Sequence, residues 1–224
     1  MHSIEICGLK IGSSHPPYVI CELSANHTGN FDAAIRLIDA AKKTGADAVK
    51  IQTYRADTIT LDSDRPEFRI SGGLWDGRTL HDLYEEAHTP WDWHKPMFDH
   101  ARKIDVTLFS SPFDPTAVDL LEDLGAPAYK IAAFEAVDLN LIRYVASTGK
   151  PMIISTGMAD AEEIEEAIAA ARVQQVRRRA WPLVLDSGQW LLAAGPDYAA
   201  AAGLGREAAH APDGELSLIH ISEP

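Results

Sequence analysis

A helix pattern followed at once by a strand pattern occupies residues 30–53, which read NFDAAIRLIDAAKKTGADAVKIQT. Asn30 is a suitable N-cap, apolar residues then recur at helical spacing, and Gly45 is suited to end the helix. A short β-rich run follows at residues 48–53. This stretch therefore predicts one helix, and the strand after it, of an α/β fold.

The same alternation continues on both sides of this stretch. Further β-rich runs, each followed by an amphipathic helical run, occupy residues 18–23, 106–110, 128–131 and 151–156. Five β–α units in a row indicate a parallel sheet with helices outside it, either open or closed into a barrel. The first turn lacks a Gly-x-Gly-x-x-Gly pattern, and polar residues gather at the strand ends, which favours the barrel. We predict a (β/α)8 TIM barrel that is incomplete here, with about five legible units.

Helix starts are marked by capping residues and prolines. Asp160 followed by Glu163 has the spacing of a capping box. Thr89-Pro90 predicts a helix with proline at its first position, and Pro96 predicts a kink or a restart within that helix. Before it, residues 54–88 are predicted to form a long polar connection rich in Asp, Arg and Gly.

Bulk composition excludes several classes of protein. The 224 residues are 46% hydrophobic and carry a formal net charge of −13, which argues against a general nucleic-acid binder. The two cysteines are too few for a disulfide scaffold. The first residues show no signal-peptide pattern, and no stretch approaches the roughly 20 apolar residues of a membrane span. We expect a cytoplasmic protein that binds neither nucleic acid nor a membrane.

The pattern changes after residue 172. Residues 173–179 are polar and basic, and a Gly- and Ala-rich stretch follows. A short apolar run at residues 183–185 resembles a strand, but no convincing continuation of the alternation is visible. The final eight residues, SLIHISEP, look like a translated sequencing adapter. We therefore expect a barrel segment, 1–172, and a divergent tail, 173–224, produced by a frameshift or an assembly artefact.

Polar side chains gather at the carboxyl ends of the predicted strands. Glu22, Lys50 and Lys130 lie in otherwise apolar strand sequence, where an unpaired charge is costly. Two lysines with nearby hydroxyls and backbone N–H groups can hold a phosphate and a carboxylate together. The residues alone thus predict a barrel-like enzyme with an anion-binding rim. Its other candidates are Asn26, His27, Gln52, Thr53, Ser110, Ser111, Glu135, Ser155 and Thr156.

Several of these residues also have a purely structural interpretation. Lys50 could extend from a strand end into solvent, and His27 is more commonly a hydrogen-bonded loop histidine than a ligand. Ser111 and Ser155 could belong to turns and caps. The segment 91–95, WDWHK, fits the solvated face and first turn of a helix.

Five short motifs follow one another in chain order. They read CELSANHTGN (21–30), GADAVKIQT (45–53), FSSPF (109–113), PAYKI (127–131) and ISTGM (154–158). As an ordered set they closely resemble the N-terminal barrel of the sialic acid synthase family, over roughly residues 3 to 172. Two more segments, 74–80 and 83–95, look most like the pseudaminic acid branch, with the N-acetylneuraminate synthases as the rival branch.

The resemblance implies a specific chemistry. Members of the family condense phosphoenolpyruvate (PEP) with the open-chain aldehyde of an amino sugar and release phosphate, using Mn²⁺ or Mg²⁺ as a Lewis acid. In the pseudaminic branch the sugar is 2,4-diacetamido-2,4,6-trideoxy-altrose. By motif, Glu22 would position the sugar or handle a proton. The expected PEP-binding residues are Lys50, Ser111, Lys130 and Ser155, and the expected sugar contacts are Asn26, Gln52 and Glu135.

This sequence departs from the family pattern in two ways. Ala133 stands where the family has a PEP-contacting serine, which predicts PEP binding weaker by ~1 kcal/mol. The family's metal-binding histidines and its C-terminal antifreeze-like domain have no counterpart in residues 1–172. Full-length members are homodimers, but we expect this polypeptide alone to be inactive, and its uncovered sheet edges favour aggregation.

Two other hypotheses stay open. Lys130 would suit a Schiff-base aldolase on the same barrel, which borohydride trapping with a keto acid would reveal. A non-catalytic sugar- or phosphate-binding module would bind ligand without turnover.

Overall fold

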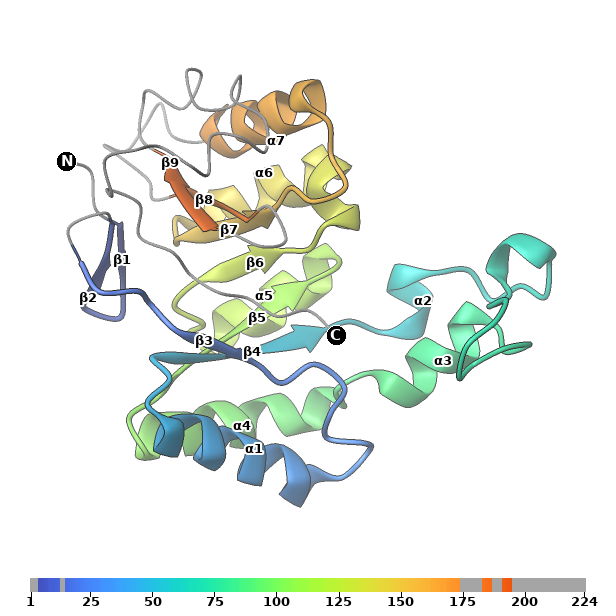
Figure 1. Ribbon diagram of the computed structural model, residues 1–224, viewed down its shortest axis with the longest axis horizontal. Coiled ribbons are helices and arrows are strands. Elements are labelled where there is room, and N and C mark those ends of the chain that lie inside the picture. The colour runs from blue at the N-terminus through green and yellow to red at the C-terminus, as the bar shows by residue number, and fades with distance from the viewer. Residues whose placement is uncertain (1–3, 13–14, 174–182, 187–190, 195–224) are drawn as a thin grey trace.

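The computed structural model describes residues 4–12, 15–173, 183–186 and 191–194. Within them, a curled sheet has its strands in chain order (Figure 1). Neighbours from β3 to β8 are parallel, and β9 is antiparallel to β8. The fold is therefore an incomplete barrel, as predicted. The strands are β3 (Ile20–Glu22), β4 (Ala48–Thr53), β5 (Thr107–Pro112), β6 (Tyr129–Ile131), β7 (Met152–Ser155), β8 (Leu183–Asp186) and β9 (Leu191–Ala194).

Helices between the strands cover the outer face of the sheet (Figure 1). The Asn30 side chain caps the first of them by accepting a hydrogen bond from the Ala33 N–H at 2.9 Å, and Gly45 ends it at φ +90°. Asp160 and Glu163 form the predicted capping box at the start of α7, with bonds of 2.8 and 2.9 Å. The helices are α1 (Phe31–Thr44), α4 (Trp91–Lys103), α5 (Pro115–Asp123), α6 (Leu139–Thr148) and α7 (Ala161–Val173).

Helix α4 differs from the sequence prediction at Pro90 and, of the kink or restart expected at Pro96, shows no restart. Pro90 is the N-cap rather than the first helical residue, and the helix does not restart at Pro96. The missing N–H of Pro96 would have bonded the Asp92 carbonyl. Both residues lie on the exposed face, so water can solvate that carbonyl and the helix can continue.

The connection between β4 and α4 contains more structure than its polar composition suggests. It includes α2 (Ala56–Ile59), a 3₁₀ turn (Pro66–Phe68) and α3 (Leu80–Ala87). Thr79 caps α3 by accepting from the Asp82 N–H at 3.1 Å. Figure 1 shows α2 and α3 projecting beyond the carboxyl end of β4.

A hairpin that the sequence analysis did not predict lies at the opposite, amino end of the strands (Figure 1). It pairs β1 (Ile4–Ile6) with β2 (Leu9–Ile11) through a turn with positive φ at both Cys7 and Gly8, the geometry of a two-residue hairpin turn. Its buried isoleucines form an inner apolar core with residues in or just before the strands, a set comprising Ile4, Ile6, Ile11, Tyr18, Ile20, Ala48, Phe109, Ala128 and Ile153.

A second, larger core packs the helices against the outer face of the sheet. It includes Val49 and Ile51 of β4, Ile131 of β6 and Ile38 of α1. None of the described helices is long and apolar enough to cross a membrane.

Candidate active site at the carboxyl ends of the strands

The inner face of the sheet changes from apolar to polar along the strands. Its amino half belongs to the inner core, and side chains two positions apart on a strand share a face. The register pairs Glu22 with Lys50 and Gln52 with Ser111. Six of the eight predicted site residues therefore share the inner face at the carboxyl ends of five neighbouring strands. They are Glu22, Lys50, Gln52, Ser111, Lys130 and Ser155.

Lys50 lies at the centre of this face. Its side chain is 2% exposed and forms an ion pair with Glu22, whose side chain is 6% exposed. The Lys50 Nζ also donates to the Ser111 Oγ at 3.5 Å, and the Ser24 N–H donates to the Glu22 Oε1 at 2.8 Å. Burial excludes the interpretation of Lys50 as a lysine that extends into solvent. The ion pair offsets part of the desolvation cost of the ammonium.

Lys130 supplies a second buried ammonium on β6, and its residue is 0% exposed. Its neighbours in the sheet are β5, which carries Ser111, and β7, which carries Ser155. Strands β4 and β6 lie two strand spacings apart, about 10 Å, and the curl of the sheet turns their inner faces toward each other. Two ammonium groups flanked by hydroxyls form an arrangement suited to a ligand with two anionic groups.

The remaining two predicted residues lie in loops at the same end of the strands. Asn26 is exposed in the loop after β3, where its Nδ2 donates to the Leu23 carbonyl at 3.0 Å. Glu135 is half-buried in a 3₁₀ turn, Phe134–Val137, after β6. Both lie at the rim rather than on the strands, which fits contacts to a larger or later-bound part of a ligand.

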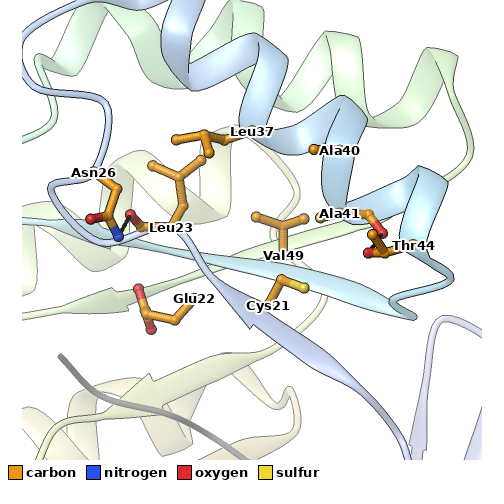
Figure 2. Close-up of a pocket in the computed structure, with 9 residues that line it drawn as sticks. All are labelled: Cys21, Glu22, Leu23, Asn26, Leu37, Ala40, Ala41, Thr44 and Val49. Atoms are coloured by element: carbon orange, nitrogen blue, oxygen red, sulfur yellow. Dashed lines mark hydrogen bonds between the residues drawn. The ribbon is translucent and has the colours of Figure 1, made fainter.

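A cavity of about 270 Å³ lies beside β3, against helix α1 (Figure 2). Its lining is mostly apolar and includes Leu23, Leu37 and Val49. Glu22 and Asn26 reach its border, but the lysines and serines of the inner face do not line it. Because it lacks cationic side chains, this cavity is unsuited to the anionic ligand predicted from the sequence.

His27 is a structural histidine in the loop after β3. It is 0% exposed, its Nδ1 accepts from the Gly29 N–H at 3.1 Å, and its Nε2 lies 3.4 Å from the Thr89 Oγ1. Its ring packs edge-on against Trp93, with 5.5 Å between centroids. Burial, with a smaller effect of His88, lowers its pKa. These contacts support the loop-histidine interpretation over a ligand role.

His94 is not among the candidate site residues identified from the sequence. The sequence analysis favours a solvated helix face for its segment, residues 91–95. The structure corrects this expectation, since His94 is 0% exposed and lies between α4 and the sheet. A signal is present in the sequence, because residues 94, 97, 98 and 101 follow the i, i+3, i+4, i+7 spacing of a buried helix stripe. His94 contacts Thr53, which lies on the outer face of β4 rather than in the candidate site.

Among the described residues, no three His, Cys, Asp or Glu side chains gather in a way that could hold a metal ion. The described part of the chain therefore does not itself fit the divalent metal implied by the resemblance, and we derive no metal-dependent step from its residues.

Comparison with known proteins places this geometry in a family. The sequence profile of the NeuB family matches residues 37–183. The chain belongs to the NeuB family. Over 147 residues it is 51% identical to the pseudaminic acid synthase of Campylobacter jejuni, covering 66% of this chain and 43% of that protein. Over 157 residues it is 48% identical to the pseudaminic acid synthase of Helicobacter pylori, covering 70% of this chain and 46% of that protein.

A solved structure has a similar fold. The crystal structure of an N-acetylneuraminic acid synthetase from Leptospira borgpetersenii, in complex with citrate, superposes with a TM-score of 0.69 at 26% identity. The match covers 82% of this chain and 58% of that one. The chain spans less than half the length of the two curated pseudaminic acid synthases that it matches.

Proposed function

We propose that this chain is the N-terminal part of a pseudaminic acid synthase. The enzyme would condense PEP with 2,4-diacetamido-2,4,6-trideoxy-altrose to give a nonulosonic acid and phosphate. Identity of 48 to 51% to two pseudaminic acid synthases supports the choice of branch. The observation that carries the proposal is the inner face itself, where two buried lysines and two buried serines lie on consecutive strands.

PEP would bind to the four buried residues of β4 to β7. Lys50 and Lys130 would neutralise its phosphate and carboxylate, and Ser111 and Ser155 would fix its orientation by hydrogen bonds. Because these side chains are buried, each charge interaction is stronger than it would be in solvent. The Glu22 carboxylate holds the Lys50 ammonium in place before the ligand arrives.

The proposed reaction forms one carbon–carbon bond. The C3 carbon of PEP attacks the aldehyde carbon of the sugar, whose oxygen takes up a proton. Water adds at C2 and loses a proton, which gives a tetrahedral intermediate with a hydroxyl and the phosphate oxygen on C2. The bond between C2 and the phosphate oxygen then breaks, and the hydroxyl proton passes to the departing phosphate as the C2 ketone forms. Glu22 would position the sugar or move one of these protons. No Schiff base is required, so Lys130 would act by charge.

The sugar would extend from PEP toward the rim, where Gln52, Asn26 and Glu135 would contact it. A divalent metal, Mn²⁺ or Mg²⁺, remains part of the proposal, with its ligands on a part of the longer protein outside residues 1–172. The complete protein would act as a homodimer.

The proposal can be tested with a chimera that joins residues 1–172 of this chain to the second half of the C. jejuni enzyme. The chimera is supplied with PEP, Mn²⁺ and one sugar, and phosphate release is followed. Release only with the diacetamido sugar supports the proposal. Release only with N-acetylmannosamine would assign the chain to the N-acetylneuraminate synthases.

The same chimera separates the other hypotheses. PEP binding without turnover on either sugar would favour a binding module. Covalent labelling of the chain by a keto acid and borohydride, absent in Lys130→Met, would favour the aldolase. We expect the present chain alone to release no phosphate.

A further inference from the structure

A buried network of hydrogen bonds lies behind the candidate site, between helix α4 and the outer face of the sheet. The His94 Nδ1 lies 3.1 Å from the Pro90 carbonyl, and its Nε2 lies 2.8 Å from the Thr53 Oγ1. The Thr53 Oγ1 lies 2.6 Å from the Ser110 Oγ, which lies 3.1 Å from the Ile51 carbonyl. His94, Thr53 and Ser110 are all 0% exposed.

Hydrogen-bond complementarity sets the direction of the network. The Pro90 carbonyl can only accept, so the proton of a neutral His94 lies on Nδ1. Nε2 then accepts from the Thr53 hydroxyl, whose oxygen accepts the single proton of Ser110. With this proton used, the Ser110 Oγ makes no second hydrogen bond to the Ile51 carbonyl. Burial lowers the pKa of His94 to about 4, so the ring is neutral near pH 7 and can accept at Nε2.

The network holds residues that alternate with those of the candidate site. Thr53 follows Gln52 directly on β4, and Ser110 precedes Ser111 directly on β5. The register pairs Ile51 with Ser110 and Gln52 with Ser111. Because successive side chains point to opposite faces, bonds made on the outer face also fix the backbone that carries the inner side chains.

We propose that His94 is a positioning residue for the candidate site. Its neutral ring links β4 to β5 on the outer face and thereby sets where Gln52 and Ser111 present their side chains on the inner face. Ser111 in turn accepts from the Lys50 Nζ, so the effect extends to one of the two buried ammonium groups. The identity of the ligand rests on the proposed function, whereas the positioning itself does not.

Three variants of this chain test the proposal. His94→Leu removes both ring contacts at similar volume. His94→Gln keeps an oxygen acceptor that can reach the Thr53 hydroxyl. Phe98→Leu is the matched control, because Phe98 is 2% exposed on the same helix and lies outside the network. Each variant is examined by the backbone amide signals of Gln52 and Ser111 in NMR spectra and by titration with PEP.

His94→Leu is expected to shift the Gln52 and Ser111 signals and to weaken PEP binding about tenfold. His94→Gln is expected to recover most of the affinity, and Phe98→Leu to leave both readouts close to the parent values. Unchanged signals in His94→Leu, or equal shifts in Phe98→Leu, would overturn the proposal. If His94→Leu does not fold, Thr53→Val removes the same link at constant shape and is judged by the same criteria.

A measurement on the unmodified chain gives an independent result. The imidazole nitrogen shifts are expected to show His94 neutral at pH 7 with its proton on Nδ1, and a charged ring or a proton on Nε2 would contradict the proposed direction of the network. If the unmodified chain binds no PEP, the proposed function loses its support, while the Gln52 and Ser111 signals still decide the role of His94.

Discussion

The two ends of the inner face use the same strands for different purposes. At the amino end, Phe109 and Ile153 pack with the isoleucines of the hairpin in a core without charged side chains. Two residues further along, the same strands carry Ser111 and Ser155, between and beside the buried lysines of β4 and β6. The amino end therefore contributes mainly to stability, and the carboxyl end carries groups that stability alone does not require.

The largest expected change in stability comes from a substitution in the apolar core at the amino end. Phe109→Ala removes a large side chain that is 0% exposed and should lower the free energy of unfolding by about 4 kcal/mol, measured by urea denaturation. Phe134→Ala is the control, because Phe134 is 72% exposed, and it should change stability by less than about 0.5 kcal/mol. Equal effects of the two substitutions would contradict the packed amino end.

The next largest effect is a pH dependence of stability, caused by His94 on the outer face of the sheet behind the carboxyl end. The unfolded chain protonates His94 near pH 6.5, but burial lowers the folded-state pKa to about 4. As the pH falls through this window, the unfolded state binds a proton that the folded state does not. Stability should therefore decline from pH 6.5 toward pH 4, by roughly 3 kcal/mol for this residue.

This pH effect is measured as the difference between the parent chain and His94→Gln in urea denaturation at several pH values. Subtracting the variant removes the contribution of other titrating groups. Parallel stability curves for the two proteins would show that His94 does not contribute.

At the carboxyl end, Lys130→Met should weaken ligand binding. Loss of a buried ammonium should weaken PEP binding about a hundredfold or more. Because removing one partner of a buried charge interaction also destabilises a fold, the free energy of unfolding should fall as well, and the affinity is measured on protein whose fold is checked by circular dichroism. Lys103→Met, at an exposed position of α4, removes the same charge from the surface and should change neither the PEP affinity nor the free energy of unfolding. If both variants lost a comparable amount of PEP affinity, Lys130 would contribute only through the net charge of the chain.

The smallest expected effect is a gain in PEP affinity at the rim of the candidate site. Ala133→Ser adds a hydroxyl at the rim and should tighten PEP binding about fivefold, which corresponds to ~1 kcal/mol. Ala132→Ser, one residue earlier and also half-buried, is the control and should leave the affinity unchanged. Calorimetric titration measures both, and equal affinities for the two variants would argue against a ligand contact at position 133.

Periodic features of the fold could be predicted from the sequence. The strand expected at residues 48–53 has the same extent as β4, and the Asn30 cap and Gly45 stop of α1 are confirmed. Local rules determine these features, because capping groups and alternating side chains lie close together along the chain. The same alternation places Lys50 and Gln52 on one face of their strand from the order of residues alone.

Features that depend on distant contacts could not be predicted. The ion pair between Glu22 and Lys50 joins two strands, and no local sequence pattern indicates that these two residues are partners. The hairpin strands are three residues long, too short for a periodic signal, and their burial depends on the inner face of the sheet. Helical spacing with residues 97, 98 and 101 indicates that His94 is buried, but its hydrogen-bond partner Thr53 lies 41 residues away and could not be predicted.

The most direct test of the central claim is a crystal structure of this chain soaked with PEP. The account predicts PEP on the inner face, with its phosphate and carboxylate at the Lys50 and Lys130 ammonium groups and with Ser111 and Ser155 as hydrogen-bond donors. PEP bound elsewhere, such as in the apolar cavity beside α1, or no PEP bound at saturating concentration, would contradict it.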